Sequence, residues 1–168
     1  MLNILNLIVS SYIFLLSVIG YGKFFRYNIL NIKEDLKSLD GVFGLFILTF
    51  LSYFTSFILK HNYAHNLVIL IIGLFFFIKN FDIKFLKIFT IIYLLLFLSF
   101  IILKTHDDFF YYHFHYSLTI INDKIQFGLG NLGHGYKHHS SFFIFNSLTY
   151  LPFISFNLFN IINFFILI

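Results

Sequence analysis

The sequence predicts an all-α, polytopic integral membrane protein with about five transmembrane helices and one large outer loop that contains an interfacial helix. Two observations support this prediction. Of the 168 residues, 60% are hydrophobic and only 11% are charged, whereas a soluble globular domain carries about 25% charged residues. The mean hydropathy is +0.90. The apolar residues also fall into long runs with few charges, which is the pattern of transmembrane helices.

We expect the whole chain, 1–168, to form a single membrane domain. The first apolar run closes at Gly20 and Gly22. It lacks a basic N-terminal region and a small-residue cleavage site, so we expect a retained helix and not a signal peptide. The third run is short, so we expect it to borrow part of the preceding polar turn to reach the ~20 residues that a bilayer requires. The expected spans cover 2–21, 41–59, 67–78, 88–103 and 142–168, and the outer loop covers 104–141.

The last apolar run differs from the others in two respects. Pro152 and three asparagines, Asn157, Asn160 and Asn163, interrupt it. The chain also ends at Ile168 directly after this run, with no polar residue following. We therefore expect the chain to be an N-terminal portion of a longer protein.

The distribution of Lys and Arg predicts the orientation in the membrane. The loops after the first and third spans carry four and three of these residues, while the turn between the second and third spans carries one. The outer loop carries three in a much longer segment. Because cytoplasmic loops are enriched in Lys and Arg, the turn 60–66 and the loop 104–141 are expected outside a cytoplasmic (inner) cell membrane. All eight histidines fall on this side, which indicates one shared site.

Composition excludes several classes of function. The chain has no cysteine, which excludes disulfides, thiolate metal sites and cysteine nucleophiles. The formal net charge is +4, but the basic residues are spread along the loops. That is typical of membrane anchoring and not of a nucleic-acid surface.

The start of the outer loop offers carboxylates and aromatic residues. Two interpretations of Asp107 and Asp108 stay open, because one of them can cap the next helix and capping does not exclude catalysis. The segment 108–123 is predicted to be a helix along the membrane interface, on which Asp108 and Tyr112 share a face. Its aromatic residues are expected at headgroup depth; they are Phe109, Phe110, Tyr111, Tyr112 and Tyr116.

The loop histidines raise the question of a metal. His113 and His115 cannot share a helical face, although an extended segment would let both bind one ion. Together with Asp107, Asp108, His138 and His139, they could hold a divalent metal. Solvated interfacial histidines are the more common explanation, so no cofactor is assigned.

Residues 128–133 match G-x-G-x-x-G, but the dinucleotide-binding fingerprint needs a βαβ unit that this sequence does not offer. The glycines instead allow tight turns and close approach of the backbone to a ligand. Lys137 and Ser140 then lead into the last span. A helix start with a cation beside it can bind an anion such as a lipid-linked phosphate. The alternative is a plain re-entrant turn with an interfacial lysine.

Four short runs carry a resemblance to a known group. DFFYYH at 108–113, GLGNL at 128–132, HGYK at 134–137 and SS at 140–141 resemble the signature D-x-x-x-Y-H … G-L-G-N-L … H-x-R … N-S-S. That signature belongs to bacterial polytopic membrane proteins similar to C-class, lipid-phosphosugar-dependent glycosyltransferases. The turn at 61–66 looks like the upstream part of the same group, and the resemblance covers roughly 40–152.

The resemblance implies transfer of a sugar from a polyprenyl-phosphate donor to an extracytoplasmic acceptor in the cell envelope. The catalytic carboxylate carried over is Asp108, with Asp107 as the alternative. Lys137 stands where the group has arginine, and His138 replaces a small or apolar residue. The group also has many more spans. The substrate-binding residues that the resemblance implies are Tyr112, His113, Asn131, His134, Lys137 and Ser140.

Two other functions are considered. The chain could be a non-enzymatic, small polytopic subunit or scaffold that binds lipid headgroups or a partner protein. A histidine-rich metal or proton transport element is the third interpretation and ranks last, because the spans lack the charged residues that a transport path usually needs.

Overall fold

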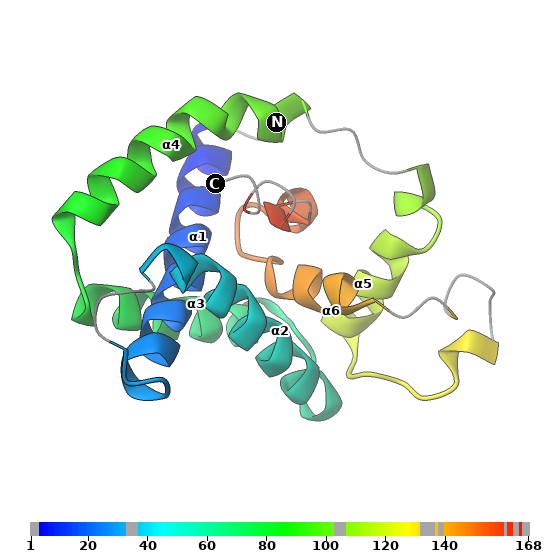
Figure 1. The fold of residues 1–168 in the computed structure, drawn as a ribbon. Coiled ribbons are helices and arrows are strands. Elements are labelled where there is room, and N and C mark those ends of the chain that lie inside the picture. Colours follow the sequence, from blue (N-terminus) through cyan, green and yellow to red (C-terminus); the bar gives the residue numbers. More distant parts are fainter. Residues whose placement is uncertain are drawn as a thin grey trace.

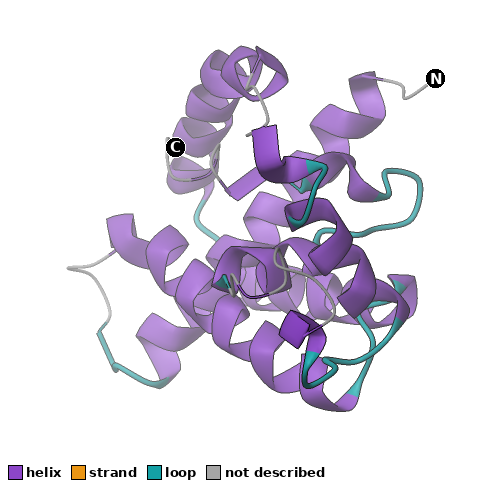
Figure 2. Cartoon of the chain, turned by 90° about the vertical axis from the view of Figure 1, so that its right-hand side faces the viewer, coloured by secondary structure: helices purple, strands orange, loops and turns teal. Residues whose placement is uncertain are grey.

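The computed structural model describes residues 4–32, 37–102, 107–131, 137, 140–159, 161–162 and 165. Within these residues the fold is all-α, as predicted, with six α-helices and no strand (Figures 1 and 2). The helices are α1 (Ile4–Asn28), α2 (Asp40–Ile58), α3 (Tyr63–Lys79), α4 (Ile83–Ile102), α5 (His113–Asn122) and α6 (Ser141–Leu148).

Helix α1 lies at the centre of the bundle and packs against both α2 and α3. It does not end at Gly20 and Gly22 as expected but continues to Asn28. The glycines serve close packing instead. A Cβ atom at Gly20 would overlap the backbone of Gly73 on α3, and one at Gly44 on α2 would overlap the backbone of Val18. Small residues that let helix backbones approach closely are typical of helices packed in membranes.

Helix α4 crosses the N-terminal half of α1 (Figure 1). Two polar contacts join these helices. The Tyr93 hydroxyl lies 2.7 Å from Oγ of Ser11, and the Tyr12 hydroxyl lies 2.6 Å from Oγ1 of Thr90. Such buried hydroxyl pairs satisfy polar groups inside an otherwise apolar helix contact. The α4 helix begins five residues earlier than the predicted span at 88–103.

Helix α3 includes part of the polar turn before the third apolar run, as expected. It starts at Tyr63, and the side chain of Asn62 caps it by accepting a hydrogen bond of 3.0 Å from the backbone N–H of His65. An asparagine at this position satisfies one of the free N–H groups at a helix start. Helix α2 agrees with the predicted span at 41–59 to within one residue.

The expected span over 142–168, which Pro152 and three asparagines interrupt in the sequence, is not a single helix in the described residues. Helix α6 ends at Leu148, and the chain then turns between Leu151 and Ser155, where Phe153 and Ser155 have φ angles of 69° and 50°. Pro152 explains this break, since proline lacks the N–H group and restricts the preceding residue. Four residues after the turn are buried in the main core: Leu158, Ile161, Ile162 and Phe165. Their path reaches the start of α2, where the ring of Phe165 lies against Gly41.

The start of α5 also differs from the prediction. The helix begins at His113 and its N-cap residue is Tyr112, so neither aspartate occupies the cap position. Residues Asp107–Phe109 form a separate 3₁₀ turn, and Asp108 and Tyr112 therefore do not share a helical face. The aromatic residues that were expected together at the membrane interface differ in exposure. Phe109 and Tyr116 are buried, whereas Phe110 and Tyr111 are exposed.

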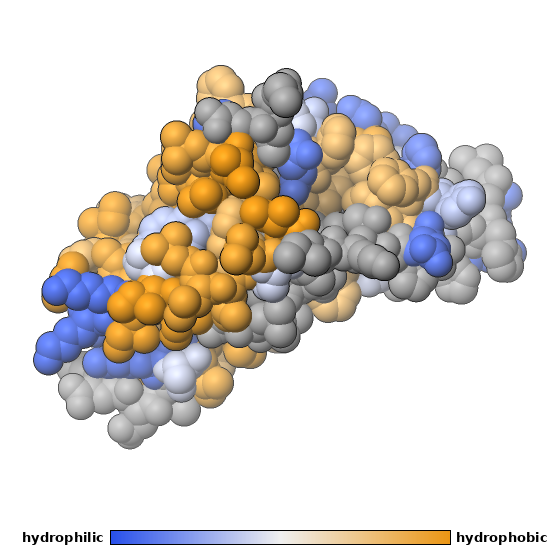
Figure 3. Space-filling model, turned by 90° about the horizontal axis from the view of Figure 1, so that it is seen from above, coloured by the Kyte–Doolittle hydropathy of each residue, from blue (hydrophilic) through white to orange (hydrophobic). Residues whose placement is uncertain are grey.

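The surface of the protein is unusually apolar. Exposed large apolar side chains outnumber buried ones, and α2, α3 and α4 each carry a row of them. Figure 3 shows apolar residues over the middle of one face, with hydrophilic residues gathered toward its ends. Exposed apolar area of this extent marks contact with a membrane or another protein. By length and composition, the helical segments Ile4–Asn28 and Lys37–Ile58 could each cross a membrane.

Candidate functional site

The turn between α2 and α3 packs directly against the loop at 104–141, as the grouping of histidines in these two segments suggested. The backbone N–H of His61 donates to the carbonyl of Ile120 on α5 over 2.9 Å. Further along the loop, the N–H of Ile125 donates to the carbonyl of Ser56 at the end of α2 over 2.8 Å. Two segments that are separated by about 60 residues in the sequence are thus joined by backbone hydrogen bonds.

The side chain of His61 is completely buried in this contact. Its Nδ1 lies 2.6 Å from Oγ of Ser147 on α6, and its Nε2 lies 3.0 Å from Oγ1 of Thr55. Burial, with a smaller contribution from the neighbouring charge of His65, lowers the pKa of His61 to about 3. His61 is therefore neutral at physiological pH and acts as a hydrogen-bonding link between α2 and α6.

Asn66 connects the same segments through its amide. Its Nδ2 contacts the carbonyl oxygens of His61 (2.9 Å), Ser147 (2.8 Å) and Tyr150 (2.9 Å), and its Oδ1 lies 2.9 Å from Nδ1 of His65. Because the amide oxygen can only accept, Nδ1 of His65 carries the proton. We call His61, His65, Asn66 and Ser147 the histidine–asparagine cluster.

One atom of this cluster is available for chemistry. The His65 ring stacks on the His61 ring, with centroids 4.5 Å apart. With the proton on Nδ1, neutral His65 has a lone pair on Nε2. This nitrogen is buried and has no hydrogen-bond partner among the residues that the structure describes. An unpaired imidazole nitrogen can accept a hydrogen bond from a ligand.

Two of the predicted site residues, Tyr112 and His113, pack against α6 at Phe143, one turn before Ser147. The His113 ring lies 4.4 Å from the Phe143 ring between centroids, and the half-buried Tyr112 lies 6.1 Å from it. Oγ of Ser117 on α5 donates to the carbonyl of Phe143 over 2.9 Å. Phe143 and Ser147 share one face of α6, because residues four apart on a helix do so. The Tyr112–His113 pair and the histidine–asparagine cluster therefore pack against the same helix face.

The remaining predicted site residues are placed as follows. Ser140 is the N-cap of α6, and its Oγ accepts a hydrogen bond of 3.3 Å from the N–H of Phe142. Asn131 and Lys137 are exposed, and so is Asp107. For Asp108 the structure describes only the backbone, in the 3₁₀ turn before α5, and His134 lies outside the described residues. The structure thus brings Tyr112, His113 and Ser140 to α6.

No group of three potential metal ligands occurs in the described part of the chain. Two residues of the proposed ligand set, His138 and His139, lie outside the described residues. Among the described histidines, His61 and His65 lie together, but the hydrogen bonds of His61 occupy both of its ring nitrogens.

Sequence reasoning singled out the turn at 61–66 but missed its partners. Thr55, Ser117 and Ser147 are isolated hydroxyl residues inside largely apolar runs, where they attract no attention. A usable signal in the sequence is the four-residue spacing of Ser52 and Ser56, which places them on one side of α2. In the structure both side chains are buried. Hydroxyl residues repeated at helical spacing within an apolar run indicate a face that packs against another polar group.

The chain matches no protein-family model, no curated protein and no solved structure.

Proposed function

We propose that the protein is a multi-pass protein of the cytoplasmic membrane, with the histidine–asparagine cluster and α5 on the outer side. The observation that carries this proposal is the inverted distribution of side chains. Rows of Phe, Ile and Leu are exposed on α2, α3 and α4, while serine, asparagine and charged side chains are buried between the helices. A lipid environment favours this arrangement, since water would favour its reverse.

Five crossings are compatible with this proposal, although the last one is not a single helix. The segment after Ser140 contacts His61 through Ser147 at one end of α2 and lies against Gly41 through Phe165 at the other. Helix α2 has 19 residues and is thus about 28 Å long, close to the ~30 Å hydrocarbon thickness. Broken segments are tolerated at membrane depth where protein surrounds them, and this one is buried against α1.

The orientation can be tested with a single cysteine, since the chain has none. Asn122 is exposed at the end of α5, so Asn122→Cys should react with a membrane-impermeant maleimide in intact cells or spheroplasts. Ser38→Cys, in the exposed 3₁₀ turn Lys37–Leu39 before α2, should react only after lysis. The reverse pattern of labelling would contradict the proposed orientation.

For the activity, we propose transfer of a sugar from a polyprenyl-phosphate donor to an acceptor outside the cytoplasm. The resemblance of residues 108–141 to C-class glycosyltransferases supports it. The packing of Tyr112 and His113 against Phe143 of α6 also supports it, since Ser140, another residue of the resemblance, caps the N-terminus of this helix. In this proposal, Asp108 takes the proton of the acceptor hydroxyl, and Lys137 neutralises the departing phosphate. The transition state resembles an oxocarbenium ion.

The test is sugar transfer by the purified protein in lipid, with a polyprenyl-phosphate sugar as donor. Asp108→Asn keeps the shape of the side chain and removes its charge, so we expect the rate to fall about 10²–10⁴-fold, as is typical for loss of a general base. Asp123→Asn is the matched control, because Asp123 is an exposed carboxylate in the same loop. If only Asp107→Asn abolishes transfer, the base is Asp107. If neither substitution lowers the rate, neither aspartate is the base. If the wild-type protein transfers no sugar, a non-enzymatic subunit is the better description.

A further inference from the structure

Two adjoining cavities lie at the end of the bundle opposite the histidine–asparagine cluster. One is a small polar cavity of about 20 Å³ beside Lys23 and Asp82. The other is an apolar cavity of about 350 Å³ between α1, α2 and α4, with Leu45 among its walls. Lys37 and Phe85 line both cavities. A polar space that opens beside an apolar one has the general form of a site for an amphiphile.

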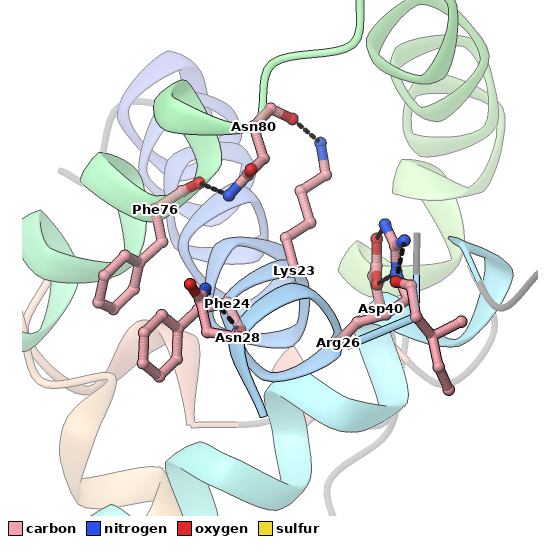
Figure 4. A network of polar contacts seen from close by, with 8 residues as sticks. Lys23, Phe24, Arg26, Asn28, Asp40, Phe76 and Asn80 are labelled. Carbon is pink, nitrogen blue, oxygen red and sulfur yellow. Dashed lines mark hydrogen bonds and ion pairs between the residues drawn. The ribbon is translucent and has the colours of Figure 1, made fainter. Parts of the chain in front are cut away.

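The polar cavity contains an ammonium group that is incompletely satisfied. Lys23 is only 3% exposed, and its Nζ donates to the carbonyl of Asn80 over 2.8 Å (Figure 4). It also lies over the rings of Phe77 and Phe85, at 4.4 and 5.0 Å from their centroids. An ammonium has three N–H donors. A buried cation is costly unless an anion or several hydrogen bonds compensate its charge.

The carboxylates nearby are already engaged. Asp40 forms two hydrogen bonds with the guanidinium of Arg26, at 2.6 and 3.0 Å. Asp82 accepts hydrogen bonds from the backbone N–H groups of Lys84 and Phe85 at the start of α4. Among the described residues, three cations, Lys23, Arg26 and Lys37, therefore face two carboxylates around this cavity. The surplus positive charge of these residues lies on the two lysines. An anion would complement it.

The apolar cavity is suited to a hydrocarbon chain. Its volume falls within the ~300–1,000 Å³ of ligand pockets, and its other walls come from Ile19, Ile92 and Phe165. Val42 and Ile88 also line it, and these residues are 61% and 60% exposed on the apolar surfaces of α2 and α4. The cavity thus opens on the surface that the proposed membrane arrangement places in the hydrocarbon layer.

We propose that the adjoining cavities bind an anionic phospholipid, with its phosphate at Lys23 and Lys37 and one acyl chain in the apolar cavity. The ligand is a lipid because a phosphate and a hydrocarbon chain are needed together. It is a membrane phospholipid because the cavity opens sideways between α2 and α4. The site requires the membrane location but not the sugar transfer proposed for the opposite end.

The test compares two lipids that differ only in headgroup charge. Purified protein in a non-ionic detergent is titrated with dioleoylphosphatidylglycerol or dioleoylphosphatidylcholine, and the bound lipid is measured by native mass spectrometry. We expect the anionic lipid to bind about tenfold more tightly, since each lysine near an anionic headgroup favours binding. Equal binding of the two lipids by the wild-type protein would overturn the proposal.

Three variants locate the site. Lys37→Gln changes an exposed residue and should remove most of the preference for the anionic lipid, and Lys23→Met should do the same. Leu45→Trp fills the apolar cavity and should weaken the binding of both lipids while keeping the preference between them. Because Lys23 is buried and its variant can fail to fold, Lys37→Gln decides the outcome if that happens.

The control is Lys60→Gln, at an exposed lysine in the turn at the opposite end. It should leave the preference unchanged. An equal loss in Lys60→Gln and Lys37→Gln would mean that anionic lipid binds through the overall charge and not at this site. If polyprenyl phosphate binds more tightly than the phospholipid in a manner that depends on Lys37, the assignment to a phospholipid is wrong.

Discussion

The two ends of the helix bundle bury polar side chains by different chemistry. At the arginine end, formed by Lys23, Arg26 and Asp40, a guanidinium and a carboxylate pair directly, and each is about 1% exposed. At the histidine end, formed by the histidine–asparagine cluster, a neutral imidazole, an amide and a hydroxyl share hydrogen bonds. Of the two, only the arginine end carries a buried ion pair.

The difference follows from what each end holds together. At the arginine end, α1 and α2 approach so closely that a Cβ atom at Gly22 would overlap the backbone of Asp40. The ion pair joins two helices that already pack along their length, so it fixes their register. At the histidine end, the segments joined are the turn between α2 and α3, helix α5 and the broken α6 segment. A neutral network can tie such loop segments together without the large desolvation cost of an ion pair.

The largest effect is expected from breaking the ion pair. Asp40→Asn keeps the shape of the side chain but removes the carboxylate charge that pairs with the buried guanidinium of Arg26. Removing one partner of a buried pair typically costs about 3–5 kcal/mol, so the free energy of unfolding in detergent should fall by that amount. Thermal or denaturant unfolding of the purified protein measures it.

Asp82→Asn is the control for this comparison. Asp82 caps α4 through the N–H groups of Lys84 and Phe85, and asparagine can accept the same hydrogen bonds. We expect a change of less than about 1 kcal/mol. Equal losses in the two variants would show that the ion pair contributes no more than a helix cap.

A smaller but clear effect is expected at the histidine end. Asn66→Ala removes the amide that contacts the carbonyl oxygens of His61, Ser147 and Tyr150. Leaving buried polar groups unsatisfied costs about 1–3 kcal/mol, so we expect the free energy of unfolding to fall by about that amount. Asn62→Ala, in the same turn, removes only the cap of α3 and should cost about 1 kcal/mol. A smaller loss for Asn66 than for Asn62 would contradict the role of the network.

The sequence was sufficient for the parts of the fold that depend on local pattern. The all-α class and the extent of α2 follow from apolar runs and their polar ends, and these predictions are confirmed. The end of α1 was misplaced, because Gly20 and Gly22 look like helix terminators until their packing against α3 and α2 is seen. Local sequence does not distinguish a glycine that ends a helix from one that admits a neighbouring backbone.

The site was predictable only in part for the same reason. The grouping of histidines on one side correctly indicated that the turn at 61–66 meets the outer loop. The residues that complete the contact, Ser147 and Thr55, lie 86 and 6 positions from His61, and nothing local marks them. The prediction that a helix starts at Asp108 was wrong, because the side chain of Phe109 is buried in the core and the two aspartates lie in a separate turn before α5. Such tertiary burial overrides local helix signals.

The last prediction uses proton binding to distinguish the two ends. Burial lowers the pKa of His61 to about 3, whereas a histidine in an unfolded chain has a pKa of about 6.5. Between these values the unfolded state binds the additional proton, so the free energy of unfolding falls as the pH falls. The stabilisation is fully present above pH 6.5 and is lost progressively toward pH 3.

One pH unit corresponds to about 1.4 kcal/mol, so lowering the pH from 6.5 to 5 should cost the wild-type protein about 2 kcal/mol through His61. The measurement is unfolding in a non-ionic detergent between pH 5 and 7.5. His61→Gln keeps a hydrogen-bonding side chain without a titrating group, so its pH dependence should be flatter. His115→Gln, at an exposed histidine on α5, should keep the wild-type dependence. If wild type and His61→Gln lose stability equally on acidification, His61 is not held neutral by burial, and the histidine end does not differ from the arginine end in the way that the structure indicates.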